Sequence, residues 1–225
     1  MFIKVNEVEL FYEKSGKGPS VLLLHGNGED HRIFDVLVKK LSQNYTVYAI
    51  DIRDHGKSSK VKNLNYHDMM EDMAGFIREL EIHKPILFGF SDGGIVGMLL
   101  AIHYPEMLSK LIISGSNTSP DGGKKMIVAI GKIVYFFTRN RKLKLMLTQP
   151  NITEEELSKI TTPTVVLAGS NDFVRDEHTR ATAKNIPNSV LNILEGENHS
   201  SYVFNNDKLY KIIKPYLTAY NMLVK

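Results

Sequence analysis

ILFGFSDGG, residues 86–94, is the stretch of sequence that decides the fold. It sets a G-x-S-x-G pattern between a short apolar run and a segment with helical spacing. A serine on a sharp strand-to-helix turn is held in a strained conformation that exposes its hydroxyl, and the helix behind it offers backbone N–H groups to an anion. The five-residue pattern alone is equally typical of a glycine-rich turn. Ser91 is therefore a candidate nucleophile only if the surrounding sequence predicts the matching fold and partner residues.

Short apolar runs recur on both sides of this turn and alternate with longer segments of helical spacing. Such runs suit strands buried on both faces, and their alternation with helices predicts a mostly parallel sheet. The expected strands are Val21–Leu24, Thr46–Ile50, Ile86–Phe90, Leu111–Ser114, Thr164–Ala168 and Val190–Leu194. The expected helices are His31–Leu41, Tyr66–Leu80, Gly93–His103, Asp176–Asn185 and Asp207–Tyr220.

The start of the chain predicts a further element, a β-hairpin. Phe2–Val5 and Val8–Tyr12 alternate in polarity on either side of Asn6-Glu7. The fold class is therefore α/β, a mostly parallel doubly wound sheet of about eight strands with an N-terminal hairpin and helices on both faces. A length of 225 residues suits one such domain.

The alternation breaks between about residues 116 and 159. Apolar residues there recur at three- and four-residue spacing, which predicts helix; they are Met126, Ile127, Ile130, Ile133, Val134 and Phe137. We expect a single domain with a core of residues 1–115 and 160–225, and a short helical cap inserted at 116–159. So small a cap predicts a shallow or partly open pocket.

Composition excludes several classes of function. The chain has no cysteine, so disulfides, cysteine-zinc sites, iron-sulfur clusters and cysteine nucleophiles are ruled out. Its 28 basic and 25 acidic residues give a net charge of +3, which argues against nucleic acid as the main partner. The eight histidines show no ligand spacing such as H-E-x-x-H, so no metal is expected.

The sequence also lacks the signals of export and of membrane insertion. Lys4, Glu7 and Glu9 interrupt the place where a signal peptide would need an apolar run, which favours a cytoplasmic location. The longest apolar stretch, Met126 to Phe137, is interrupted by Lys132 and is shorter than the ~20 residues that span a bilayer. We expect no stable membrane insertion.

Two further polar residues follow strands of the predicted sheet. Asp172 comes just after the strand ending at Ala168, and His199 comes just after the next strand. Loops at the carboxyl ends of parallel strands share one edge of the sheet, so Ser91, Asp172 and His199 are expected to converge there. The order Ser, Asp, His is the one that accompanies a serine on such a turn.

A fourth polar block, His25-Gly26-Asn27-Gly28, follows the first strand of the predicted sheet. The backbone N–H groups of Asn27 and Asp92 are expected to form an oxyanion hole. With DIRDHGKS at 51–58, GSND at 169–172 and NHS at 198–200, the chain resembles the α/β-hydrolase superfamily over all but the insertion. Asp54 departs from the family pattern, which more often has glycine before His-Gly, and this bears on the local loop geometry.

Within that superfamily the chain is similar to small serine esterases, lactonases and carbon-carbon hydrolases. The resemblance implies acyl transfer in which Ser91 attacks a small ester or lactone, His199 carries the proton and Asp172 orients the imidazole, with no cofactor. A serine at the turn sets aside the branches with a carboxylate nucleophile, the haloalkane dehalogenases and epoxide hydrolases. Carbon-carbon bond hydrolysis, a lyase-type elimination and a low-turnover ligand-binding receptor remain alternatives.

Some residues have both a structural and a functional interpretation. Asp92 either complements the dipole of its helix or contacts a cationic group of the substrate, with the first interpretation favoured. Candidate pocket residues, mostly apolar, favour a hydrophobic acyl or aryl group; they are His25, Phe90, Tyr135, Phe136, Phe137, Phe173 and Val174, of which His25 is expected to lie beside the site and to fix its loop.

The insertion carries an uneven charge. Between Gly122 and Gln149 it has seven basic residues and no acid: Lys124, Lys125, Lys132, Arg139, Arg141, Lys142 and Lys144. The simplest interpretation is a solvated helix face whose apolar residues pack over the pocket. The alternative is attraction of acidic substrates or transient contact with an anionic lipid surface.

Overall fold

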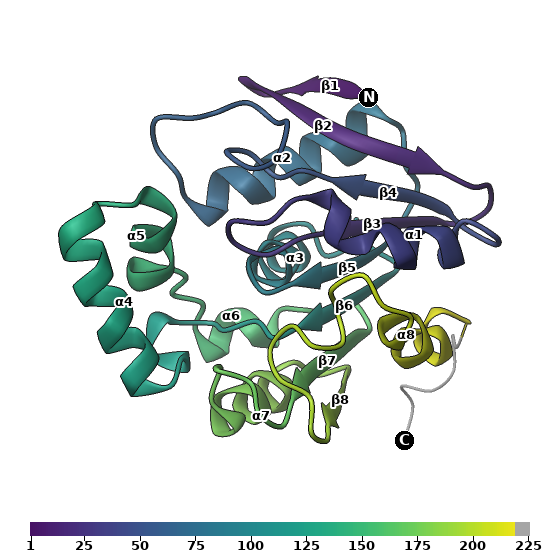
Figure 1. The fold of residues 1–225 in the computed structure, drawn as a ribbon. Helices are drawn as coiled ribbons and strands as arrows, with labels where there is room; N and C mark the ends of the chain where they lie inside the picture. The colour runs from purple at the N-terminus through teal and green to yellow at the C-terminus, as the bar shows by residue number, and fades with distance from the viewer. Residues whose placement is uncertain (219–225) are drawn as a thin grey trace.

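The sheet of this protein has eight strands, in the order β1-β2-β4-β3-β5-β6-β7-β8 (Figure 1). The structure is a computed structural model that describes residues 1–218. The strands are β1 (Phe2–Val5), β2 (Val8–Ser15), β3 (Ser20–Leu24), β4 (Thr46–Ile50), β5 (Ile86–Phe90), β6 (Lys110–Ser114), β7 (Thr164–Gly169) and β8 (Ser189–Leu194). β1 and β2 form the expected antiparallel hairpin, and β2 pairs antiparallel with β4. The other neighbouring pairs, β4-β3, β3-β5, β5-β6, β6-β7 and β7-β8, are parallel.

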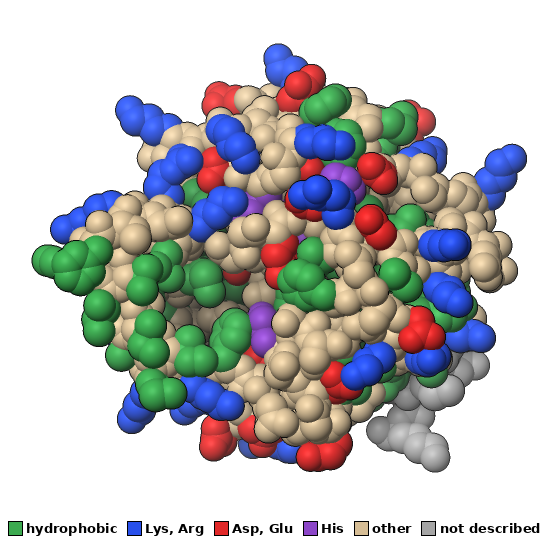
Figure 2. All heavy atoms as spheres, viewed as in Figure 1, with side chains coloured by type: hydrophobic (Ala, Val, Ile, Leu, Met, Phe, Trp, Pro, Cys, Tyr) green, Lys and Arg blue, Asp and Glu red, His purple; other side chains and the backbone are tan. Residues whose placement is uncertain are grey.

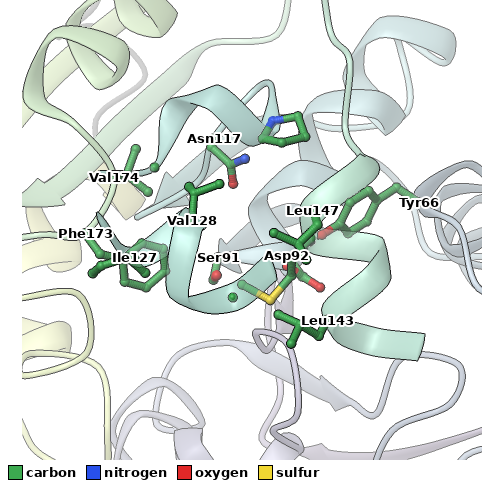
Figure 3. Close-up of a pocket in the computed structure, with 14 residues that line it drawn as sticks. Tyr66, Ser91, Asp92, Asn117, Ile127, Val128, Leu143, Leu147, Phe173 and Val174 are labelled. Carbon is green, nitrogen blue, oxygen red and sulfur yellow. Dashed lines mark hydrogen bonds between the residues drawn. The ribbon is translucent and has the colours of Figure 1, made fainter. Parts of the chain in front are cut away.

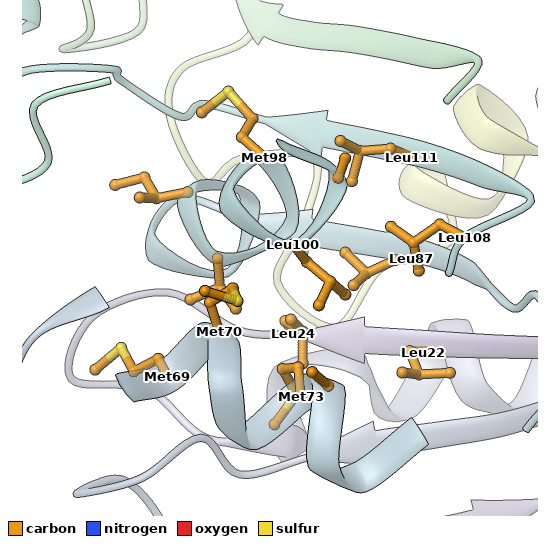
Figure 4. Close-up of a cluster of buried hydrophobic side chains, with 14 of the residues drawn as sticks. Leu22, Leu24, Met69, Met70, Met73, Leu87, Met98, Leu100, Leu108 and Leu111 are labelled. Carbon is orange, nitrogen blue, oxygen red and sulfur yellow. The ribbon is translucent and has the colours of Figure 1, made fainter. Parts of the chain in front are cut away.

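Helices cover both faces of the sheet. They are α1 (Asp35–Leu41), α2 (Tyr66–Glu79), α3 (Asp92–His103), α4 (Lys125–Thr138), α5 (Arg141–Thr148), α6 (Glu154–Ser158), α7 (Asp176–Asn185) and α8 (Lys208–Thr218), with short 3-10 helices at His31–Phe34 and Pro120–Gly122. Leucines and methionines of α2 and α3 pack against one face (Figure 4). α1 and α8 supply the core on the other face.

The alternation of side chains along β3 explains how one strand serves both cores. Leu22 and Leu24 belong to the cluster under α2 and α3, whereas Val21 and Leu23 belong to the cluster under α1 and α8. Burial on both faces is why these strands are continuous apolar runs. β8 is different, because all its residues are only half-buried. It lies at the edge of the sheet, and β7 is its one neighbouring strand among residues 1–218.

The predicted fold class is confirmed, and the predicted elements differ from the observed ones mainly at their ends. The first expected helix begins as a 3-10 turn at His31 and becomes α-helical at Asp35. The last expected helix is described from Lys208 to Thr218, and its predicted end at Tyr220 lies outside the described residues. Among residues 1–218, no helix combines the length and apolar character needed to cross a bilayer.

The segment between β6 and β7 forms helices, as its spacing predicts. α4 and α5 pack against each other and stand beyond the carboxyl ends of the central strands, at the left of Figure 1, while α6 packs against α7. α4 has no buried residue, so most of its apolar side chains are not part of the core. How this segment divides the chain into core and cap stays a prediction.

Candidate active site

Ser91 lies at a sharp turn between β5 and α3. Its backbone has φ 51° and ψ −115°, a conformation that L-residues rarely adopt, and its N–H donates to the carbonyl of Ser114 at 2.8 Å. The two glycines of the pattern are needed for close backbone contact. A Cβ atom at Gly89 would lie 2.3 Å from the Gly93 carbonyl oxygen, and one at Gly93 would lie 2.3 Å from the Leu24 carbonyl oxygen. The strained turn therefore requires glycine on both sides of Ser91, because no side chain fits between the closely packed backbone segments.

Asp172 and His199, from the loops after β7 and β8, form a hydrogen-bonded pair. The distance between His199 Nδ1 and Asp172 Oδ1 is 2.8 Å, and Asp172 is 2% exposed. Asp172 Oδ1 also accepts the Val174 N–H at 3.0 Å, whereas Oδ2 has no partner among the described residues. An ionised carboxylate only accepts, so Nδ1 carries the proton and Nε2 is left as the basic nitrogen.

Two aromatic rings flank the imidazole of His199. The ring centroid of Phe173 lies 3.9 Å from that of His199, and the centroid of Phe90 lies 4.9 Å from it. Phe90 directly precedes Ser91, so the imidazole lies over the chain that carries the serine. The hydrogen bonds of residues 1–218 do not include one between the Ser91 hydroxyl and His199; such contacts often tighten only when substrate is bound.

The loop after β3 lies close to the same serine. A Cβ atom at Gly26 would be 3.1 Å from Ser91 Cβ, so only glycine lets the loop approach this closely. Within the described part of the chain, the backbone N–H groups of Asn27 and Asp92 have no acceptor. Two open donors beside a serine are what an oxyanion requires.

Asp92 connects this loop to α2. Its Oδ2 accepts from Asn27 Nδ2 and its Oδ1 accepts from the Tyr66 hydroxyl, each at 2.8 Å. The residue is 2% exposed, and burial raises the pKa of its carboxyl. Both oxygens are thus engaged by protein groups. This arrangement favours a bracing role for Asp92 over contact with a substrate ammonium.

A cavity opens in front of Ser91 (Figure 3). Its empty volume is about 660 Å³, part of it open to solvent. The wall opposite Ser91 comes from α4 and α5 and is apolar. The residues that line the cavity are Tyr66, Ser91, Asp92, Asn117, Pro120, Gly123, Ile127, Val128, Gly131, Leu143, Met146, Leu147, Phe173 and Val174.

The structure brings some of the predicted pocket residues to the cavity and places others elsewhere. Phe173 and Val174 line it. Phe90 is buried and packs against His199 instead. Tyr135 and Phe136 are not in the lining, because α4 faces the cavity through Ile127, Val128 and Gly131; Phe136 is 63% exposed and its ring meets that of Phe137, which is itself exposed.

His25 lies behind the cavity lining and fixes the loop that carries Asn27. Its Nδ1 contacts the Gly26 carbonyl at 2.8 Å, and its Nε2 accepts the Ile52 N–H at 3.2 Å. Nδ1 is therefore the protonated nitrogen of a neutral ring. Burial lowers the pKa of His25 to about 4, in keeping with that neutral form.

Several cavity residues have no signal in the sequence. Tyr66 opens α2 and Asn117 follows β6, and neither stands in a recognisable motif. Leu143, Met146 and Leu147 do recur at helical spacing in α5, so their common face was detectable, but not its partner. Their part in the cavity arises from tertiary packing alone.

In the described part of the chain, a carboxylate-histidine cluster lies outside this site. Ligand atoms of Asp30, His31 and Asp51 lie within 4.8 Å of one another. The oxygens of Asp51 already accept from the backbone N–H groups of His31 and Lys57 and from the His31 ring. These bonds make the cluster a brace for the loop after β4.

Comparison with known proteins identifies the fold family of this chain. The family model for the alpha/beta hydrolase fold matches residues 19–145. The serine hydrolase BPHL of Homo sapiens is 26% identical over 96% of this chain and 85% of its own length. A thermophilic esterase from Thermogutta terrifontis has a TM-score of 0.81 at 22% identity, covering 96% of this chain and 98% of its own. The enol-lactonase from Burkholderia xenovorans LB400 has a TM-score of 0.80 at 19% identity, covering 97% and 100%.

Proposed function

The chain belongs to the alpha/beta hydrolase fold family, and from this premise we propose that it is a serine hydrolase that cleaves small carboxylic esters or lactones. The observation that carries the proposal is the convergence of three features. They are a serine on a strained strand-to-helix turn, a histidine hydrogen-bonded to a buried carboxylate, and two backbone N–H groups without an acceptor among residues 1–218. Each of these groups has a defined part in acyl transfer.

In the proposed acylation step, Ser91 Oγ attacks the ester carbonyl while its proton passes to His199 Nε2. The negative charge that develops on the carbonyl oxygen is held by the N–H groups of Asn27 and Asp92. Asp172 stabilises the imidazolium through Nδ1–H. The proton then moves from Nε2 to the leaving oxygen, the C–O bond breaks, and the acyl group remains on the serine.

Deacylation repeats these steps with water as the nucleophile. His199 removes a proton from the water as it attacks the acyl-serine carbonyl, and returns the proton to Ser91 Oγ when the acid leaves. In a lactone the leaving oxygen stays attached to the acyl group, so a single hydroxy acid is released.

The cavity lining supports an apolar acyl group as the preferred substrate portion. Its wall is formed by aliphatic residues of α4 and α5, and no basic side chain lines it. Burial of one methylene contributes about 0.8 kcal/mol, so kcat/KM is expected to rise about fourfold per added CH₂ until the cavity is filled. This trend is measured as kcat/KM for the acetyl, butyryl and hexanoyl esters of p-nitrophenol.

The decisive test compares wild type with Ser91→Ala on that ester series. We expect Ser91→Ala to lower kcat by about 10⁴-fold or more, because the nucleophile is removed and the rest of the site is kept. Ser200→Ala, next to His199 and without a side-chain hydrogen bond among the described residues, is the control and keeps full activity. A fluorophosphonate labels wild type and the Ser200 variant only.

Two results would favour one of the alternative functions over a serine esterase or lactonase. Turnover of a vinylogous diketone, lost in Ser91→Ala, with no turnover of any ester would identify a carbon-carbon hydrolase. Equal rates for wild type and Ser91→Ala on every substrate, with no labelling, would reject the serine-hydrolase proposal and favour a ligand-binding receptor.

A further inference from the structure

The outward side of α4 is apolar and uncovered in this chain. We call it the α4 face and define it by the exposed residues Met126, Ile127, Ile130, Ile133, Val134, Phe136 and Phe137. Met126 is 74% exposed and Phe137 is 79% exposed. Apolar side chains gather on the α4 side of the molecule beside a hollow (Figure 2). Contiguous apolar patches of this kind mark interaction surfaces, since monomers rarely expose them.

Cations surround the α4 face without carboxylate partners. Among residues 1–218, none of the following forms an ion pair with an acid: Lys124, Lys125, Lys132, Arg139 and Lys144. Arg139 lies beside the Phe136 ring, with its guanidinium carbon 5.3 Å from the ring centre. Arg141 does pair with Asp54, at 3.2 Å. The charge around the face is therefore positive and available to an external anion.

We propose that the α4 face docks on an anionic phospholipid surface, with its apolar side chains at the acyl-chain boundary and the surrounding lysines against the headgroups. A helix that combines large apolar residues with unpaired cations has the two properties that interfacial binding requires. A second copy of the chain fits less well. A two-fold contact would bring the two sets of cations together, and residues 122–149, which include α4 and α5, contain no acid to pair with them.

The docking helix is also a wall of the cavity. Ile127 is both 44% exposed and part of the cavity lining, so the α4 face adjoins the opening in front of Ser91. When the protein is docked on a bilayer, this opening lies next to the acyl-chain region, into which apolar esters partition. This last consequence rests on the proposed function, whereas docking itself does not.

Vesicle co-sedimentation of the full chain tests the proposal. Ser91→Ala is used alongside wild type, so that binding is measured whether or not the protein hydrolyses esters. We expect both proteins to sediment with vesicles containing phosphatidylglycerol, and to bind pure phosphatidylcholine at least tenfold more weakly. Binding to the anionic vesicles falls as salt is raised, because the headgroup charge is screened.

Two double variants separate the apolar and the charged contributions. Phe136→Ser with Phe137→Ser removes the most exposed rings, and Lys125→Glu with Lys132→Glu reverses two cations; each pair is expected to weaken binding by at least about tenfold. The controls make the same kinds of change elsewhere: Phe2→Ser replaces one exposed aromatic residue in β1, and Lys39→Glu with Lys40→Glu reverses two cations on α1. Both controls should bind like wild type.

Three results would overturn the proposal. The first is equal binding to anionic and neutral vesicles, or binding to neither. The second is a loss of binding in the controls as large as in the α4 variants. The third is a dimer in sedimentation equilibrium that Phe136→Ser with Phe137→Ser dissociates while lipid binding is absent, which would assign the α4 face to a second copy of this chain.

Discussion

Glu29 follows Asn27 in the loop after β3, and its carboxylate contacts the backbone of that loop. Its Oε2 accepts the Gly26 N–H at 2.9 Å, and a Cβ atom at Gly26 would lie 2.9 Å from that oxygen and 3.1 Å from Ser91 Cβ. Burial raises the pKa of Glu29 to about 7, with the nearby charges of Asp92 and Asp30 acting in the same direction. The carboxyl of Glu29 thus changes charge near neutral pH, close to the candidate nucleophile.

The raised pKa of Glu29 predicts a stability that depends on pH. The folded protein holds this proton more tightly than the unfolded chain, so the contribution of Glu29 to stability is full below about pH 4.5 and is lost as the pH rises through about 7. Glu29→Gln cannot ionise and keeps an oxygen for the Gly26 N–H. The Tm of Glu29→Gln relative to wild type should rise by about 2–4 °C between pH 5 and pH 8.5. The same Tm difference at both pH values would contradict this.

At the scale of elements, α3 is pressed against the sheet through its glycines. Gly93 faces the backbone of β3, where a Cβ atom would lie 2.3 Å from the Leu24 carbonyl oxygen. Gly97 faces only side-chain ends, with a Cβ atom 2.7 Å from Leu111 Cδ1 and 2.9 Å from Leu87 Cδ2. Backbone cannot move aside without shifting a strand, whereas leucine methyl groups can turn away.

The two glycines therefore respond differently to alanine. Gly93→Ala is expected to lower the free energy of unfolding by about 1–3 kcal/mol or more, because β3 or the start of α3 must shift. Gly97→Ala should stay within about 1 kcal/mol of wild type, since higher helix propensity offsets the crowding of the leucines. Urea denaturation measures both. Equal stability of the two variants would refute the backbone argument.

Elements of the sheet were the part of the fold most accessible from sequence. β4 and β5 were predicted with the observed bounds, because strands buried on both faces are unbroken apolar runs between polar loops. The orientation of α4 was not accessible. Its apolar residues occur on more than one side, so spacing predicted a helix but not which side faces the cavity. Tyr135 and Phe136 were candidate pocket residues, whereas Ile127 and Val128 line the cavity.

At the scale of the whole molecule, Asp72 joins three separate parts of the fold. It is fully buried on α2 and accepts from Arg53 Nε and Nη2 at 2.5 and 2.6 Å, and from Asn6 Nδ2 at 3.1 Å. Arg53 belongs to the loop after β4 and Asn6 to the turn of the β1–β2 hairpin. The hairpin edge of the sheet is thus tied to α2 through one carboxylate.

Removing that charge is expected to be costly. Asp72→Asn leaves Arg53 with a poor partner in a buried position and should lower the free energy of unfolding by about 3–5 kcal/mol. Asp68→Asn is the control, since Asp68 also contacts Arg53, at 3.0 Å, but its side chain is 47% exposed; its loss should be about 1 kcal/mol or less. Chemical denaturation checks both, and similar losses would refute the role of Asp72.

The sequence predicted those residues of the candidate site whose positions depend on the topology of the sheet alone. Ser91, Asp172 and His199 each follow a parallel strand, so their common edge was predictable from the strand pattern. Tyr66 and Asn27 meet Asp92 through side-chain hydrogen bonds between distant parts of the chain. Such contacts depend on how α2 packs on the sheet, and no local pattern encodes that.

The candidate nucleophile and the wall of the cavity that faces it come from different parts of the chain. Ser91 and Asp92 come from the β5–α3 turn, while the facing wall comes from α4 and α5, which are joined to the sheet by the chain after β6 and the chain before β7. Under the proposed function, replacing the segment between these two junctions should change the preferred substrate and leave the reaction unchanged. The junctions after β6 and before β7 are the positions at which a chimeric protein with a different segment would be joined.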